Sequence, residues 1–525
     1  MIIGIAGLIV GVAGVALTIY GIMQARKKKT SSIPQSPPDE VEKKSPPQEK
    51  LFLVPYLRNT MLRHEDEWID KIREKLGAEG KAVISQNIAL HGQGGSGKTA
   101  MAIEYAYCFA EEYPGGVFWL QMEGGLGPAA LAFLIFADQQ GIHFGEWKNL
   151  KEQDQINMVV RFISDKPHKL VILDNVDDDI LPKELAFKDC HLIVTTRRSG
   201  LPLPLIRMDL PDKNEAVDIF CSYADREVSH LSEKERKAVL DICQRVDRLP
   251  LALEILGQLV RKYQLSDLAR KIKKEMVSLE ATTTAKEVTS VLAALNLTGY
   301  DFHGEKTKNG LLAASYLNPD MIDTKILAQI LEVDENKAAE ITAELAGYCI
   351  LIKGKDVYKI HRLTQEAART LDVKQKVGQK VVKVMDNRIK RVSEKGIYKE
   401  AYGLIPHIIQ VASLAAENLP EEKLPSSFAV SRWASFLKDS GYYSLAESLF
   451  RNCLERVDHA KGEVHKDYAA FLNNLALVLE YQGKYEEAEK LYRQALDIDE
   501  KTIGREHPGY AKHLNNLAGV LEDQG

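Results

Sequence analysis

The stretch HGQGGSGKTAM, residues 91–101, places four glycines and a serine directly before Lys98 and Thr99. The segment before it, AVISQNIALHG, reads as a short buried strand, and TAMAIEYAYCFAEEY after it has apolar residues at helical spacing. A glycine-rich turn between a strand and a helix can curl its backbone N–H groups around an anion. This strand, loop and helix decide the fold class, because they predict a phosphate-binding loop on a parallel sheet.

The spacing Gly92-x-x-x-x-Gly97-Lys98-Thr99 matches the loop that holds the phosphates of a nucleoside triphosphate. We expect Lys98 to neutralise the β and γ phosphates and the Thr99 hydroxyl to ligate Mg²⁺. The expected cofactors are therefore ATP or ADP with Mg²⁺. The expected phosphate-binding residues are Gly92, Gly94, Gly95, Ser96, Gly97, Lys98 and Thr99.

Two further apolar segments end in polar side chains. KLVILDNVDD, residues 169–178, contains Asp174, whose carboxylate would hold Mg²⁺, usually through water. HLIVTTRRSG, residues 191–200, contains Arg197, which could reach a γ-phosphate. Polar turn residues and a solvated surface arginine are the alternatives. Strands joined by helical crossovers predict a parallel, doubly wound sheet.

The segments HGQGGSGKTAMA, GGVFWLQ, LVILDNVDD, HLIVTTRR and RLPLALEILG occur in the order and spacing of the NB-ARC family. The chain resembles this family of signal-transduction ATPases over roughly residues 55–375. The resemblance implies catalytic roles for Lys98, Thr99, Asp174 and Arg197, with Mg²⁺ on Thr99 and Asp174. Arg197 would be the residue that senses the γ-phosphate.

Two later motifs extend the resemblance. In RLPLAL, Pro250 would pack on the adenine, with Arg248 in place of the family's glycine; a proline kink between two helices is the alternative. VYKIHRLTQEAAR, residues 357–369, resembles the end of the family's winged-helix domain, so His361 would contact the β-phosphate of ADP and hold a closed form. The family has aspartate after this histidine, whereas this chain has Arg362, which cannot accept the same hydrogen bonds.

Asn175 stands where many members of the family carry a second acid, and asparagine cannot act as a general base. Asp177 or Asp178 could substitute for it. We expect at most a slow ATPase, in which the nucleotide marks a state of the protein.

Residues 1–24 contain no charged side chain and are followed by ARKKK. Twenty-four residues in a helix are long enough to cross a hydrocarbon core of ~30 Å. We expect a retained transmembrane helix rather than a cleaved signal peptide, in the cell membrane, with the N-terminus outside and the bulk of the chain cytoplasmic. A single helix stripe that favours self-association carries Gly4, Gly7, Gly11, Gly14 and Gly21.

The motif LNNLA occurs at Leu472 and again at Leu514, and a related unit begins at Trp433. Helix–turn–helix units with small and aromatic residues at fixed offsets are typical of tetratricopeptide repeats, here resembling the kinesin-light-chain type. Such repeats stack into a concave groove. We expect the array to continue in a longer chain or to be covered by a partner. By the resemblance, a protein or peptide would bind at Asn473, Asn474, Asn515 and Asn516, unless these are solvated helix residues.

The fold class expected is multidomain α/β plus α, ending in an α-solenoid of tetratricopeptide repeats. The expected order is a transmembrane helix (1–24), a Pro- and Lys-rich linker (25–50), a P-loop nucleotide-binding domain (51–210), a helical ARC domain (211–280), a winged helix (281–375), a helical connector (376–430) and a repeat array (431–525).

Charge and motif order limit the function. A net charge of −5 argues against non-specific binding of nucleic acid, and none is expected as a partner. We expect a membrane-anchored ATP/ADP signalling switch, in which the repeats sense a protein or peptide and nucleotide exchange drives self-oligomerisation, as in defence or cell-death signalling. The alternative is a membrane-tethered repeat scaffold with nucleotide as a structural cofactor, and remodelling driven by hydrolysis comes third.

Overall fold

The computed structural model forms one compact unit over Lys50–Gly525. Predictions for residues 1–49, and for Asp177 and Asp178, fall outside the residues that the structure describes. Those residues are 50–59, 61–62, 65–77, 86–176, 181, 183–279, 285–299, 304–354, 357–395, 403–418, 427–461 and 465–523.

The prediction of a membrane location is corrected by the structure. Within the described ranges, no helix combines the length and the apolar character needed to cross a bilayer. The single-pass location predicted from residues 1–24 is contradicted by this finding and is withdrawn, together with the membrane as a partner. Residues 1–24, with their glycine stripe, lie outside the described residues.

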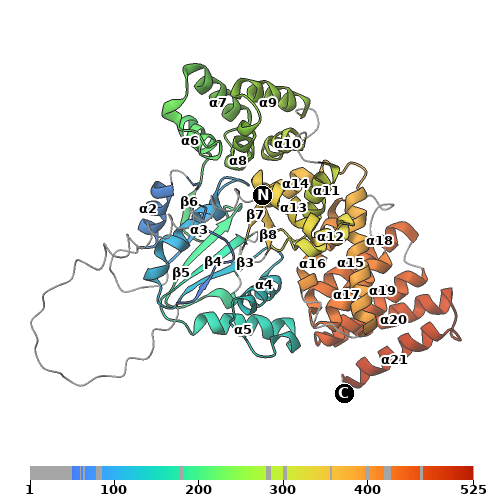
Figure 1. Cartoon of the computed structure of the whole chain (residues 1–525). Coiled ribbons are helices and arrows are strands. Elements are labelled where there is room, and N and C mark those ends of the chain that lie inside the picture. The colour runs from blue at the N-terminus through green and yellow to red at the C-terminus, as the bar shows by residue number, and fades with distance from the viewer. Residues whose placement is uncertain are drawn as a thin grey trace, which may run out of the picture. The chain divides into compact units, whose positions relative to one another are not determined.

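The N-terminal part of the described chain is built on a sheet of six parallel strands. The strands are β1 (Phe52–Leu53), β2 (Gln86–His91), β3 (Val117–Gln121), β4 (Lys169–Val176), β5 (Cys190–Thr196) and β6 (Leu205–Arg207). Their order across the sheet is β1-β3-β4-β5-β2-β6, which confirms the predicted parallel sheet (Figure 1). Because β5 lies between β2 and β4, the polar ends of these three strands meet at one edge.

Helices cover both faces of this sheet. The flanking helices are α2 (Glu65–Lys75), α3 (Lys98–Phe109), α4 (Leu126–Gln139) and α5 (Glu152–Ser164). In β4, Ile172 belongs to the core under α2 and α3, whereas Val171 and Leu173 belong to the core under α4 and α5. A parallel strand that is buried on both faces needs a continuous apolar run, and LVIL in β4 is such a run.

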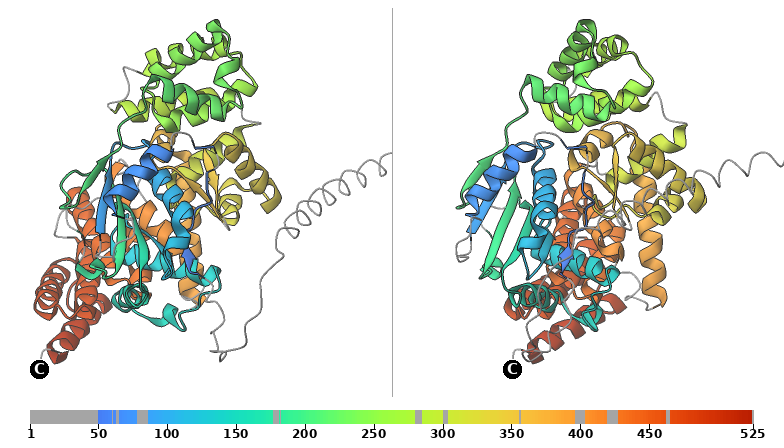
Figure 2. Two further views of the ribbon diagram at one scale, coloured as in Figure 1. Left: turned by 90° about the vertical axis from the view of Figure 1, so that its left-hand side faces the viewer. Right: turned by 60° about the vertical axis from the view of Figure 1, so that its left-hand side comes forward.

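Two helical segments follow the sheet. The first contains α6 (Lys213–Tyr223), α7 (Glu233–Arg245), α8 (Pro250–Gln258) and α9 (Leu265–Leu279), which pack on one another and are drawn in green in both views of Figure 2. The second contains α10 (Lys286–Gly299), α11 (Glu305–Tyr316), α12 (Thr324–Leu331), α13 (Glu335–Gly347), the antiparallel hairpin of β7 (Leu351–Lys353) and β8 (Tyr358–Ile360), and α14 (Arg362–Arg369). This order, helices followed by a two-stranded wing, is that of a winged helix. The second segment is called the winged-helix segment below.

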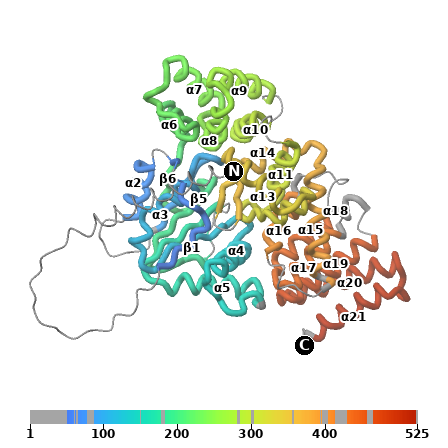
Figure 3. Tube along the Cα trace, viewed as in Figure 1, coloured from blue at the N-terminus to red at the C-terminus, as the bar shows by residue number. Residues whose placement is uncertain are grey.

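The C-terminal part is helical throughout its described residues. Its helices are α15 (Lys376–Lys395), α16 (Ile405–Asn418), α17 (Ser427–Asp439), α18 (Tyr443–Lys461), α19 (Lys466–Tyr481), α20 (Tyr485–Thr502) and α21 (Pro508–Asp523). From α17 onward each helix packs against the next, which the tube of Figure 3 traces. Gly441 and Gly483 occupy equivalent turns with φ of +85° and +76°, a conformation that glycine adopts at low cost.

The first repeat contacts the N-terminus of α5. The Tyr442 hydroxyl donates to Gln155 Oε1 at 2.7 Å in a buried hydrogen bond. The Glu152 N–H donates to the Gly441 carbonyl at 3.2 Å. A Cβ at Gly441 would lie 3.2 Å from Lys151 Cα, so the close approach favours glycine there. These contacts join the repeat array to the helical layer of the sheet domain.

Replacing Tyr442 by Phe tests this junction. The ring is kept but Gln155 Oε1 loses a buried donor, so we expect the free energy of unfolding to fall by about 1–2 kcal/mol. Chemical denaturation measures it. Tyr481→Phe is the control, because Tyr481 is 52% exposed and its loss should stay under about 0.5 kcal/mol. Equal losses in the two variants would show that the buried bond contributes nothing.

Candidate nucleotide-binding site

The loop between β2 and α3 has the shape of an anion cradle. Gly95 and Gly97 have φ of +77° and +98°, which side chains other than glycine rarely adopt. Gly97 is the N-cap of α3 and makes no side-chain cap bond. The first N–H groups of α3 are therefore not capped by a side chain, and they lie at the positive end of the helix dipole.

Lys98 begins α3 and turns back over the loop. Its Nζ donates to the carbonyl oxygens of Gly92 at 2.8 Å and Gln93 at 2.7 Å. The side chain is only 7% exposed. Burial lowers the pKa of Lys98 to about 8, and the nearby charge of Arg197 adds to the lowering. An ammonium held this way, with two neutral acceptors, is well placed to receive an anion.

Asp174, in β4, lies at the carboxyl edge of the sheet beside the loop. Its Oδ1 accepts from the Thr99 hydroxyl at 2.9 Å and from the Thr195 hydroxyl at 2.5 Å. The pKa of Asp174 is raised by burial, an effect that the Thr195 hydrogen bond partly offsets. The three residues come from α3, β4 and β5, so the strand order brings the predicted magnesium residues Thr99 and Asp174 together.

The donor set suits Mg²⁺. Mg²⁺ prefers oxygen ligands and is usually held by one or two carboxylates together with waters and phosphate oxygens. Thr99 and Asp174 offer a hydroxyl and a carboxylate in contact with each other. Among the described residues, no three His, Cys, Asp or Glu side chains gather as a metal site. An ion here would therefore depend on the nucleotide for part of its coordination.

Arg197, which follows β5, is exposed and lies against the loop. A Cβ built on Gly94 would be 3.2 Å from Arg197 Nη2. The guanidinium thus lies beside the backbone that is predicted to bind phosphates. Its role in sensing a γ-phosphate remains a prediction.

Gly95 is the point where three parts of the chain meet. A Cβ at Gly95 would lie 3.2 Å from Leu249 Cδ1, 3.3 Å from Leu363 Cδ2 and 3.4 Å from Leu251 Cβ. Leu249 and Leu251 flank Pro250, the first residue of α8, and Leu363 belongs to α14. Pro250, which is predicted to bind the adenine, therefore lies next to the loop at the start of α8.

His361 is the N-cap of α14. Its Nδ1 accepts from the Leu363 N–H at 3.1 Å, so in the neutral ring Nε2 carries the hydrogen. Burial lowers the pKa of His361 to about 3, and the positive charges of Arg362, Arg197 and Lys98 lower it further. The residue is therefore a neutral N–H donor close to Lys98 and Arg197, which suits its predicted contact with a phosphate.

Arg362 joins the sheet domain to the winged-helix segment. It makes ion pairs with Glu123 at 2.5 Å and Asp320 at 3.0 Å, and its side chain is 19% exposed. Glu123 follows β3, whereas Asp320 precedes α12 and also accepts from the Tyr56 hydroxyl at 2.7 Å. The arginine that departs from the family's aspartate thus forms a bridge of its own between the two parts.

Gln121, at the end of β3, connects this bridge to Asp174. In the amide orientation that places its nitrogen against an acceptor, that nitrogen donates to Asp174 Oδ2 at 2.9 Å. Its oxygen then accepts from Arg362 Nη2 at 2.7 Å and from Asn175 Nδ2 at 2.8 Å. Asn175 has a φ of +58°, which asparagine tolerates better than most residues. Its side chain is engaged with Gln121, and slow hydrolysis stays a prediction.

Sequence reasoning missed Tyr56, Gln121, Glu123 and Asp320 as members of the site. The available signal was the register of β3 and β4, in which Gln121 pairs directly with Asp174. GGVFWLQ ends in this glutamine, so parallel strands with aligned polar ends indicate where it must lie. No local pattern marks Asp320.

The predicted groove asparagines differ in their surroundings. Asn473 of α19 is 1% exposed, and its Oδ1 accepts from Asn516 Nδ2 of α21 at 3.0 Å. Asn474 is half-buried and Asn515 is exposed. Asn473 and Asn516 thus link two repeats, while a role of the four in peptide binding remains a prediction.

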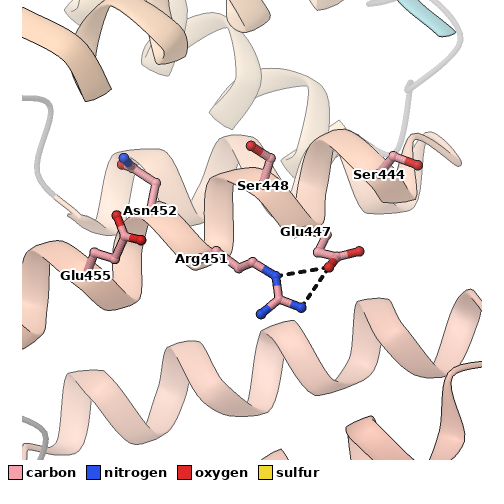
Figure 4. A pocket seen from close by; sticks show the side chains of 6 residues that line it. All are labelled: Ser444, Glu447, Ser448, Arg451, Asn452 and Glu455. Atoms are coloured by element: carbon pink, nitrogen blue, oxygen red, sulfur yellow. Dashed lines mark hydrogen bonds and ion pairs between the residues drawn. The ribbon is translucent and has the colours of Figure 1, made fainter. Parts of the chain in front are cut away.

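A polar depression lies along α18. Arg451 pairs with Glu447 and with Glu487 of α20, both at 2.8 Å, and Lys484 Nζ donates to Glu447 at 3.1 Å. These pairs hold the second helix of one repeat to that of the next. The depression, drawn in Figure 4, is lined from this one helix by Ser444, Glu447, Ser448, Arg451, Asn452 and Glu455.

Two family models match the chain. The NB-ARC domain model matches residues 65–227, and the tetratricopeptide repeat model matches residues 427–501 and 467–525. The chain contains an NB-ARC domain and tetratricopeptide repeats. Both were predicted from the motifs, and nucleotide binding is the property expected of the first.

Individual relatives are more distant. The regulatory protein AfsR of Streptomyces coelicolor is 26% identical over 213 residues, and AfsR of Streptomyces griseus is 26% identical over 212. The matches cover 38% and 39% of this chain but only 21% of each relative. A solved structure of a signal transduction ATPase with numerous domains (STAND) and a tetratricopeptide repeat sensor, from Pyrococcus horikoshii, is similar over 90% of this chain and 81% of its own, at 13% identity and a TM-score of 0.41.

The pKa of Lys98 predicts how nucleotide binding depends on pH. Phosphates favour the charged ammonium, so they raise this pKa above about 8. The affinity for ADP should be highest below pH 8 and should fall above it, by up to about tenfold per pH unit. Dissociation constants between pH 7.5 and 9.5, where the phosphates stay ionised, measure this. Lys98→Ala should bind weakly with a flat profile, and a flat profile in the unaltered chain would contradict the assignment.

Replacing Arg362 by Met tests the bridge. Asp320 and Glu123 would be left without their cation, so the free energy of unfolding should fall by about 2–4 kcal/mol. A double-mutant cycle with Glu123→Gln should give a coupling energy of about 1–3 kcal/mol. Arg270→Met is the control, since that side chain is 80% exposed and its ion pair should be worth under about 1 kcal/mol. Additive effects in the cycle would show that Arg362 and Glu123 are not energetically coupled.

Proposed function

We propose that this protein is a nucleotide-binding signalling switch, in which ADP at the Lys98 loop holds the sheet domain, α8 and α14 together. The observation that carries the proposal is the meeting of all three at Gly95, beside Lys98, Asp174 and Arg197. A ligand bound here would contact side chains from each part. Its binding energy would therefore favour one arrangement of the parts over another.

Each residue of the site would make a different contact with the nucleotide. Lys98 would exchange the carbonyls of Gly92 and Gln93 for phosphate oxygens, and the uncapped N–H groups of α3 would bind the same phosphates. Thr99 and Asp174 would hold Mg²⁺, which supplies charge neutralisation when bound. His361 would donate its Nε2–H to a phosphate and so connect α14 to the loop. Pro250 would lie against the adenine.

Exchange of ADP for ATP would release this arrangement. Arg197 lies beside Gly94, at the loop where an added γ-phosphate would bring further negative charge. The Asn175 side chain is engaged with Gln121 and offers no general base, so the ATP state would persist. A long-lived ATP state suits a signalling switch better than it suits a motor that hydrolyses ATP repeatedly.

The repeat array would be the sensor. Its first repeat is joined to α5 by the Tyr442–Gln155 bond, so a protein or peptide bound to the repeats would act on a helix of the sheet domain. Release of the array would favour the open form, and the open form would self-associate. These steps extend the proposal from binding to signalling.

The test is the identity of the bound nucleotide and the mass of the particle. The full chain is purified, its nucleotide is identified by mass spectrometry, and its mass is measured by light scattering before and after addition of a non-hydrolysable ATP analogue. We expect co-purified ADP and growth to a defined oligomer. Bound nucleotide with unchanged mass under all conditions would contradict the switch and favour a scaffold.

Lys98→Ala is the matched variant for this test. Loss of the ammonium removes charge-assisted bonds to two phosphates, so we expect nucleotide affinity to fall by about 100-fold or more. Lys148→Ala, whose side chain is 42% exposed, should retain nucleotide fully. Normal retention by Lys98→Ala would show that the nucleotide binds elsewhere.

A further inference from the structure

A second cavity lies next to the Arg362 bridge and shares Tyr56, Gln121 and Asp320 with the surroundings of the nucleotide site. It leaves about 70 Å³ of room for the centres of water-sized molecules. Trp119, Phe133 and Phe136 line it from β3 and α4, while Met321 and Val357 line it from the winged-helix segment. Apolar cavities at domain junctions with a few polar groups are the usual form of small-molecule sites.

Lys359 of β8 is the cation of this cavity. It lines the cavity and is 3% exposed. Its Nζ lies 3.4 Å from the centroid of the Tyr56 ring, a cation–π contact. Within the described ranges, no carboxylate forms an ion pair with it. Asp320, the acid on the same cavity wall, already pairs with Arg362 and accepts from Tyr56.

A buried ammonium is costly when the nearest carboxylate, here Asp320, is already paired with another cation. The pKa of Lys359 is lowered to about 8 by burial, although Asp320 and Asp174 oppose the shift. At neutral pH the group is therefore charged, and an anion that entered the cavity would supply the missing partner. The aromatic walls suit a ring or a short apolar chain attached to that anion.

We propose that this cavity binds a small amphipathic anion, with its acidic group on Lys359 and its apolar part against Trp119 and Phe133. Such a ligand would touch β3 and α4 on one side and Met321, Val357 and Lys359 on the other. It would therefore contact both parts that Arg362 bridges. The proposal stands independently of the nucleotide.

The probes are phenylacetate and its uncharged isostere phenylacetamide. Their dissociation constants for the full chain are measured by ligand-observed NMR. We expect phenylacetate to bind about tenfold more tightly or better, because its carboxylate forms a charge-assisted bond with Lys359. Equal affinities, or binding of neither compound, would overturn the proposal.

Three variants place the site. Lys359→Met keeps the length and apolar stem of the side chain, and should remove the preference for the acid. Ala132→Phe places a ring in the cavity from α4 and keeps Lys359, and should abolish binding of both probes. Lys353→Met, an exposed lysine on the other strand of the hairpin, should change nothing. Phenylacetate binding that survives both Lys359→Met and Ala132→Phe would show that the cavity is not the site. Melting temperatures confirm that each variant is folded.

Discussion

The close contact at Gly95 is the constraint on which the rest of the structure depends. The backbone there has a positive φ, and the space that a side chain would need is taken by leucines from α8 and α14. A loop that binds phosphates must leave its N–H groups free for the ligand. Leucines from α8 and α14 can approach this loop at Gly95 because glycine has no side chain. Glycine therefore serves two purposes at this position. It shapes the anion cradle and it lets two other parts of the chain rest on it.

Hydrogen bonds and ion pairs also hold the sheet domain to the winged-helix segment. Asp174, Gln121, Arg362, Asp320 and Glu123 form a connected chain of hydrogen bonds and ion pairs between the sheet edge and the winged-helix segment. Separating the two parts would leave several partly buried charges unpaired, which is expensive in a low-dielectric setting. A change at Asp174, such as coordination of Mg²⁺, would be felt at Arg362 through a single amide. A nucleotide bound as proposed would thus be connected to the closure of the two parts by direct contacts.

Local pattern was enough to predict β2, β4 and β5, the loop and the repeats. The glycines before Lys98, the apolar run in β4 and the recurrence of LNNLA each lie within a few tens of residues, and each fixes an element by its own spacing. The partners of Arg362 could not be found this way. Glu123 is 239 residues away in sequence and meets Arg362 only because β3 and β4 are in register and α14 packs on the loop.

Burial likewise escaped prediction where it depends on neighbouring repeats. Asn473 is covered because Asn516 of the next repeat unit pairs with it, a contact that repeat alignment alone does not reveal. The membrane location rested on hydropathy of residues 1–24 and was not supported by any helix in the described part of the chain. Only the fold shows that the ammonium of Lys359 lines a cavity.

Hydrogen exchange of the full chain tests the central claim, that the nucleotide determines whether α14 rests on the loop. Amide protection of peptides that cover residues 92–99 and 361–369 is compared with Mg²⁺ and either ADP or a non-hydrolysable ATP analogue. We expect both nucleotides to protect the loop, whereas ADP alone protects the start of α14. Equal protection of 361–369 by the two nucleotides, or none by ADP, would contradict it.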